Sequence, residues 1–232
     1  MNELIGYILI ILGTGIATIA QTFVSGSYSK YSKVGNKRGI SGREVARKIL
    51  DKNGLKNVKV EEVSGYLTDH YDPTKKVVRL STHNFNESSI AAVSVAAHEC
   101  GHAVQDKVGY KPMRARNSII PIVNFSSYAG YIAIAVGLAL SMMNLVWIGI
   151  AAEMVIVLFQ VITLPVEINA SKRGMKELKE EKFLNSSELP SAKTMLAAAA
   201  STYLAGVITA LLQVLRYIVL LFGRRSNGNN SD

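Results

Sequence analysis

Four long apolar stretches limit what this chain of 232 residues can fold into. They cover residues 4–24, 118–143, 145–166 and 195–222. About 20 apolar residues, at 1.5 Å per residue, are enough for a helix to cross a bilayer core of roughly 30 Å. Within the four stretches only Glu153 and Arg216 are charged. The pattern predicts four transmembrane helices, and the first is expected to be an uncleaved anchor because no basic segment precedes it.

The basic charge of the chain lies beside these stretches. The formal net charge is +9, residues 25–117 contain 17 Lys and Arg against 9 Asp and Glu, and residues 167–194 contain 6 against 5. Lys and Arg next to transmembrane helices mark the cytoplasmic side of a membrane. We therefore interpret the basic surplus as a topology signal rather than a nucleic-acid surface. Both segments are expected on the cytoplasmic face of the cell membrane.

These observations predict a mostly α-helical, multi-pass membrane protein that carries a small α+β head. The expected parts are a transmembrane anchor (1–24), a cytoplasmic head (25–117), two transmembrane helices (118–166), a cytoplasmic loop (167–194), a transmembrane helix (195–223) and a disordered tail (224–232). In the head, Ser41 is a predicted N-cap, residues 58–63 and 76–81 are predicted strands, and a longer helix is expected to end near Lys107.

The longer helix contains the sequence His-Glu-Cys-Gly-His at residues 98–102. His98 and His102 are four residues apart, about 40° around a helix axis, so both imidazoles can reach one metal ion. Glu99 is placed to take a proton from a water that the metal activates. Small apolar neighbours allow the helix to be buried, and burial of two histidines and a glutamate is costly without a metal. The alternative is a pair of hydrogen-bonded core histidines.

A hydrolytic zinc site needs a third protein ligand and one open position. Asp106 lies eight residues after His98, about 12 Å along a helix, which is too far to share the ion. His70 and His83 each lie in a turn-like stretch beside a strand and remain candidates. Glu167 is the better candidate because it stands where the third apolar stretch reaches the basic face.

Three segments together carry a family resemblance. They read "TDHYDPTKKVVRLS", "AAHECGHAVQD" and, after two apolar stretches, "LPVEINAS". The chain resembles the bacterial integral-membrane neutral zinc metallopeptidases of the YugP type. This resemblance implies that the α+β head is a zincin-like catalytic head, with one Zn²⁺ per chain bound by His98, His102 and Glu167 and with Glu99 as the catalytic residue. A wider similarity links it to prenyl-protein-processing and heat-shock-induced membrane proteases, which have Asp where this chain has Ser171.

Residues 76–81 have two interpretations. An edge strand beside the metal helix would pair with an extended substrate, which would make Val77, Val78, Arg79 and Leu80 substrate-binding residues. An ordinary interior strand fits the sequence equally well. The residues that could stabilise the oxyanion of the tetrahedral intermediate are, besides Arg79, Tyr71, His83 and Arg173.

The sequence predicts a zinc-dependent metalloendopeptidase at the cytoplasmic face of the cell membrane. Its partners are the lipid bilayer and protein or peptide substrates in extended conformation, with no nucleic acid. A zinc-activated water would attack the peptide carbonyl while Glu99 acts as general base. The alternative is a catalytically silent membrane scaffold that keeps its metal for folding or partner binding.

Overall fold

The computed structural model describes residues 2–228, with side chains as far as residue 222. Contacts between residues divide the chain into two compact units. The first contains residues up to Gln21, Ala115–Leu164 and residues from Thr202 onward, and the second contains Thr22–Arg114 and Pro165–Ser201. Each unit is therefore built from segments that are distant in the sequence.

The first unit consists of parts of four long helices. These are α1 (Asn2–Ser32), α5 (Lys111–Ala139), α6 (Met143–Glu180) and α7 (Leu189–Gly228). Each contains an 18-residue window with a mean hydropathy of at least 1.6, enough to cross a membrane. Many large apolar side chains on these helices, such as Ile11, Phe125 and Leu158, are exposed, as lipid-facing positions are. The expected mostly α-helical protein with four apolar spanning helices is confirmed.

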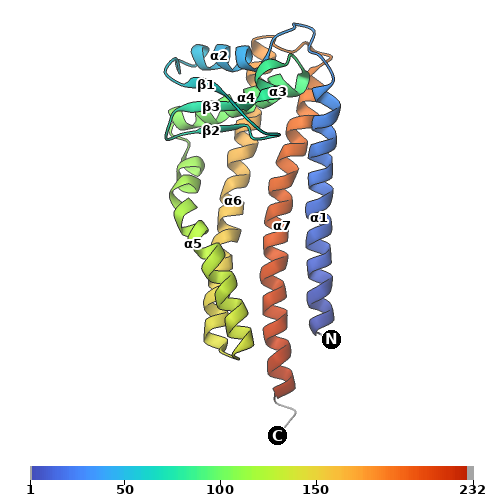
Figure 1. Cartoon of the computed structure of the whole chain (residues 1–232), viewed down its shortest axis with the longest axis vertical. Coiled ribbons are helices and arrows are strands. Elements are labelled where there is room, and N and C mark those ends of the chain that lie inside the picture. Colours follow the sequence, from blue (N-terminus) through green and yellow to red (C-terminus); the bar gives the residue numbers. More distant parts are fainter. Residues whose placement is uncertain (1, 229–232) are drawn as a thin grey trace. The chain divides into compact units, whose positions relative to one another are not determined.

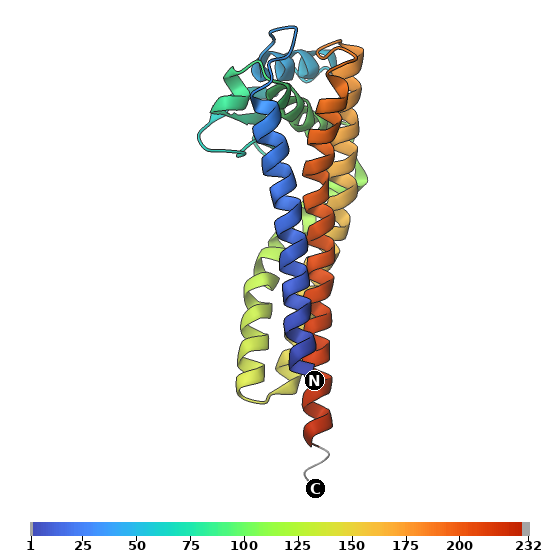
Figure 2. The same ribbon diagram turned by 90° about the vertical axis from the view of Figure 1, so that its right-hand side faces the viewer.

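Glycines allow close helix packing in the first unit, where α1 and α7 run side by side (Figures 1 and 2). A Cβ at Gly13 would lie at an ordinary contact distance of 3.5 Å from the Thr209 side chain, whereas a Cβ at Gly130 of α5 would lie 2.8 Å from Ala152 of α6, closer than real Cβ atoms approach. Small residues bring helix backbones together where the surrounding lipid provides no hydrophobic driving force.

The second unit holds three strands and three shorter helices (Figure 1). The elements are α2 (Gly42–Lys52), β1 (Lys59–Val63), β2 (His70–Asp72), β3 (Val77–Ser81), α3 (Thr82–Asn86) and α4 (Ile90–Lys107). The strand order is β1-β3-β2, with β1 parallel and β2 antiparallel to β3. Ser41 forms a capping box with Glu44, which confirms the predicted start of α2.

Two expected segments differ from the structure. Residues 167–194 were expected to form a loop, but α6 continues to Glu180 and α7 begins at Leu189. Pro165 does not interrupt α6, so Glu167 lies on a helix. The predicted disordered tail is also wrong at its start, because α7 extends to Gly228, and residues 229–232 lie outside the described residues.

The segment of α6 in the second unit packs directly against α4. A Cβ at Gly101 would lie 2.5 Å from the backbone oxygen of Ala170, and a Cβ at Gly174 would lie 2.9 Å from the backbone of Ala97. Real Cβ atoms do not approach backbone atoms so closely, so each glycine is required for this contact. The pair of glycines thus fixes how closely α6 can approach the helix that carries the histidines.

Replacement of Gly101 by Ala should therefore destabilise the protein by about 1–3 kcal/mol, the usual cost of overpacking, despite the higher helix propensity of Ala. Gly26→Ala is the matched control, because a Cβ there meets nothing within 4 Å. Thermal unfolding in detergent, followed by circular dichroism, should show a lower midpoint for Gly101→Ala only. Equal midpoints for the two variants would contradict the close contact between α4 and α6.

Candidate metal centre

Helix α4 is the buried centre of the second unit. Ser89 caps its N-terminus by accepting a hydrogen bond from the Ala92 backbone N–H (3.0 Å). Fourteen of its 18 residues are buried, among them Glu99 and His102. His98 is less deeply buried, with 14% of its side chain exposed. The helix therefore holds ionisable groups where an uncompensated charge would be costly.

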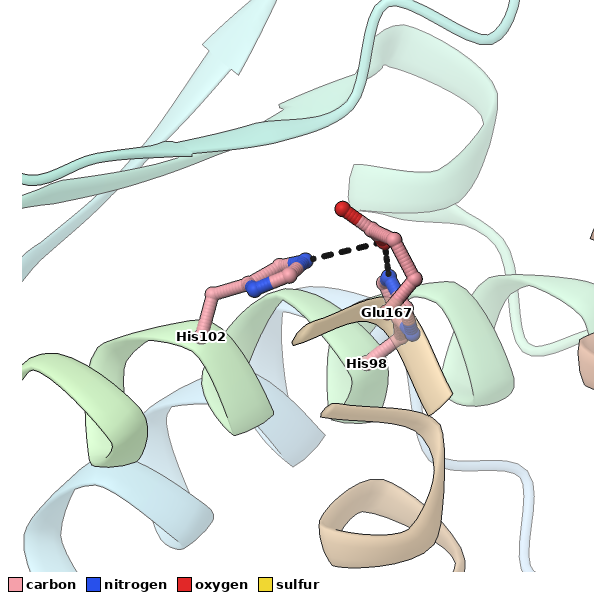
Figure 3. A group of neighbouring side chains, drawn as sticks. All are labelled: His98, His102 and Glu167. Atoms are coloured by element: carbon pink, nitrogen blue, oxygen red, sulfur yellow. Dashed lines mark hydrogen bonds and ion pairs between the residues drawn. The ribbon is translucent and has the colours of Figure 1, made fainter. Parts of the chain in front are cut away.

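His98, His102 and Glu167 converge on one point (Figure 3). The Glu167 Oε2 atom lies 3.2 Å from His98 Nε2 and 3.3 Å from His102 Nε2. One ligand atom from each of the three residues lies within 4.8 Å of the others. The two imidazole rings are nearly perpendicular, with centroids 4.8 Å apart. This arrangement brings together the three residues that the sequence singled out.

The chemistry of these atoms fits a divalent cation. Neutral Nε2 atoms and a carboxylate oxygen present lone pairs, which repel one another unless a cation lies between them. Two histidines and one glutamate are a known ligand set of catalytic zinc, which keeps a fourth position open. His98, His102 and Glu167 would therefore hold a zinc ion in this second unit.

Each histidine has a partner on its other ring nitrogen. His98 Nδ1 lies 3.1 Å from Ser171 Oγ, and His102 Nδ1 lies 3.0 Å from Gln105 Oε1. With the ring hydrogen on Nδ1, both histidines donate to these oxygens and keep the Nε2 lone pair for a metal. Such partners fix the tautomer and orientation of a ligand histidine. Ser171, which stands where the wider similarity leads one to expect Asp, thus contacts His98 through its hydroxyl.

Gln105 is a site residue that the sequence analysis missed. Its side chain is fully buried, and its Nε2 donates to the backbone oxygen of Val166 (2.8 Å) and to Asn169 Oδ1 (3.0 Å). Gln105 therefore connects His102 to the turn of α6 that carries Glu167. The sequence feature that could have identified Gln105 is its position three residues after His102, on the same face of the helix.

Glu99 lies beside the cluster of His98, His102 and Glu167 in a buried environment. Burial raises the pKa of Glu99 to about 7; a nearby His98 lowers the pKa, and the carboxylates of Glu167 and Asp69 raise it. A hydrogen bond from the backbone of Tyr71 in β2 favours the charged form. A carboxyl group with a pKa near 7 can both accept and return a proton at neutral pH.

The edge-strand interpretation of residues 76–81 is wrong. Strand β3 is central, with Val77–Arg79 paired to both β1 and β2, and Leu80 paired to Glu62 of β1. An extended substrate cannot pair with a strand whose two edges are occupied. Val77, Val78, Arg79 and Leu80 therefore do not provide a substrate-binding edge. Sequence patterns predict a strand but not its place in the sheet.

Two oxyanion candidates are held by other groups. The Arg79 guanidinium contacts Glu61 and Asp72, each at 3.3 Å. His83 is exposed in α3, and its ring lies edge-on to Tyr28. Neither contact involves the histidine and glutamate cluster. These two residues are poor choices for the stabilisation of an oxyanion.

The other two candidates are tied to the surroundings of the cluster. The Tyr71 hydroxyl donates to Asp106 Oδ2 (2.7 Å), while the backbone of Tyr71 bonds to Glu99. Arg173 Nε donates to Asn169 Oδ1 (2.8 Å), the same oxygen that Gln105 contacts. Tyr71 and Arg173 thus remain the candidates for the oxyanion. His70, a candidate third ligand, contacts Arg79 instead (3.3 Å).

Comparison with known proteins agrees with this chemistry. Residues 6–222 match the family described as "Putative neutral zinc metallopeptidase". The chain is 44% identical over 220 residues to "Putative membrane protease YugP" of Bacillus subtilis (strain 168), an alignment that covers 94% of this chain and 98% of that protein. No solved structure matches the chain. The zincin-like character of the head therefore stays a prediction.

Glu167→Gln should lose most of the bound zinc, because a neutral amide is a poor substitute for a charged ligand. The matched control on the same helix is Glu177→Gln, which affects an ion pair with Lys52 (2.9 Å) and a hydrogen bond from Asn53 (3.0 Å), neither of which involves the cluster. Metal content of the purified proteins, measured by mass spectrometry, should fall only in the first variant. Full zinc content in Glu167→Gln would exclude Glu167 as a ligand.

Proposed function

Because the chain belongs to the neutral zinc metallopeptidase family, we propose that it is a zinc-dependent endopeptidase fixed in the cell membrane, with one Zn²⁺ per chain. The observation that carries this proposal is the convergence of His98, His102 and Glu167 beside the buried Glu99. A bound zinc would supply Lewis-acid chemistry, which acidifies a water and polarises a carbonyl oxygen.

The residues around the cluster support each remaining step of peptide hydrolysis. Glu99 takes a proton from the attacking water as its oxygen bonds to the peptide carbon. Glu99 then gives the proton to the leaving nitrogen as the C–N bond breaks, so the carboxylate is regenerated. Tyr71 and Arg173 are the proposed groups that stabilise the negative charge on the carbonyl oxygen. Gln105 and Ser171 hold the two histidines in orientation throughout.

The outer edge of β2 is the proposed site for an extended protein or peptide substrate. β2 is an edge strand of the sheet, and it lies next to Glu99 through the backbone of Tyr71. Main-chain pairing with an edge strand holds a peptide without reading its side chains. β2 thus takes the role that the sequence analysis gave to residues 76–81.

Glu99→Gln should keep about one zinc per chain and lower turnover by about 10² or more, since general-base assistance is worth 10²–10⁴-fold. The control is Glu62→Gln, an exposed position on β1. The assay is cleavage of an unstructured protein in detergent, with and without a chelator. Zinc binding without any chelator-sensitive cleavage by the unmodified chain would favour the silent scaffold instead.

We further propose that the catalytic site faces the cytoplasm. Residues 25–117 carry an excess of eight basic over acidic residues (17 against 9), and such segments are retained inside the cell. The only native cysteine, Cys100, is fully buried, and burial raises the pKa of its thiol. Single introduced cysteines can therefore report topology with little background from Cys100.

Cysteines that replace Glu62 and Glu180 should be shielded from a membrane-impermeant maleimide in intact cells and react only after lysis. Both residues are exposed in the second unit. A cysteine in place of Ser141, in the turn between α5 and α6, should react in intact cells because it lies on the other side. Labelling of positions 62 and 180 in intact cells would overturn the cytoplasmic assignment.

A further inference from the structure

A cavity of about 420 Å³, open to the surface of the helices, lies among α1, α6 and α7 within the first unit. Six polar side chains line it, namely Gln21, Glu153, Gln160, Thr202, Thr209 and Gln213. They all come from helices that are apolar enough to cross a membrane. Polar and ionisable groups in such spans are costly and usually serve binding or transport.

Three of these side chains lack a partner in the protein. Gln21, Glu153 and Gln160 make no hydrogen bond or ion pair with any residue that the structure describes. Gln213, in contrast, donates to the Tyr217 hydroxyl (2.7 Å). The other residues that line the cavity around Glu153 come from α1, α6 and α7. Unpaired polar groups inside a bilayer need a complement from outside the chain.

The size and position of the cavity restrict what can fill it. A volume of about 420 Å³ is many times that of a single ion. A lipid headgroup belongs at the membrane surface, whereas Glu153 is the only charged residue of the apolar run 145–166 and lies within its interior. The lining residues of α7, from Thr202 to Gln213, extend over about 16 Å of helix. A lipid acyl chain has a similar length but offers no hydrogen bond to the polar lining, whereas one face of a helix with a polar side chain can supply it.

Small residues leave room for such a helix. Ala17, Ala205, Gly206 and Ala210 line the cavity together with the polar groups. Gly206 and Ala210 are four residues apart on α7, the spacing that lets another helix approach closely in membranes. The carboxylate of Glu153 then selects a guest that carries a cationic or hydrogen-bond-donating side chain, because no described Lys or Arg pairs with it.

We propose that this cavity binds the transmembrane helix of a protein substrate, and that Glu153 recognises a basic side chain within that helix. The membrane part of the enzyme would thus select membrane-anchored substrates. This inference rests on the proposed protease function, but the binding step can be measured without cleavage.

The test uses the full chain in lipid nanodiscs with a single-span reporter protein. Its polyleucine helix carries one central Lys or only Leu. Ala210, which lines the cavity, is replaced by the photo-crosslinking residue p-benzoylphenylalanine, and the exposed Leu211 is replaced likewise as a control. The Lys reporter should crosslink at position 210 about three- to tenfold more than the Leu reporter, as expected for a polar contact between membrane helices. Position 211 should show no preference.

Glu153→Gln should lower crosslinking of the Lys reporter to the level of the Leu reporter. The same variant should still cleave an unstructured soluble substrate at the wild-type rate, because Glu153 has no part in the metal centre. Equal crosslinking of both reporters, or crosslinks only to lipid or to a second copy of this chain, would overturn the inference. Absence of soluble-substrate cleavage by the wild type would instead refute the protease function. The crosslinking of the two reporters would still decide whether the cavity binds a helix with a basic side chain.

Discussion

The contact between α4 and α6 through Gly101 and Gly174 is the constraint on which the metal centre depends. A functional site needs its groups placed to within about 0.5 Å, and a direct backbone contact fixes the distance between the two helices. The absence of a Cβ at both glycines permits this approach. Glu167 then meets His98 and His102 from the opposite helix, while Gln105 bonds to the backbone of α6 beside it.

The sequence predicted the parts of this site that depend on local spacing. The length of the apolar runs predicted the four helices, and the four-residue spacing of His98 and His102 predicted that both imidazoles point to the same side of their helix. Glu167 needed its position at the end of an apolar run and the family resemblance, because 65 residues separate it from His102. Gln105 was missed because a buried amide has no distinctive pattern until its partner on α6 is known.

The order of the strands in the sheet also could not be predicted from the sequence. Residues 59–63 and 77–81 pair in parallel, whereas the short β2 adds to the opposite edge of β3. β3 is buried on both faces, but Arg79 interrupts the apolar run that would have marked residues 76–81 as a central strand. A three-residue strand such as β2 is also too short to show a period. An open edge next to the cluster therefore belongs to β2, the strand whose backbone bonds to Glu99.

Ser171 gives His98 a neutral hydrogen-bond partner, which affects the total charge around the cluster. A carboxylate behind His98 would add a negative charge to a site that already holds Glu167 and, close by, Glu99 and Asp69. A hydroxyl orients the imidazole without that charge, so His98 is a less basic ligand than one backed by a carboxylate. His102 is likewise backed by a neutral amide, that of Gln105. With neutral partners on both histidines, a bound divalent ion would keep more of its positive charge, which is the property that acidifies a water.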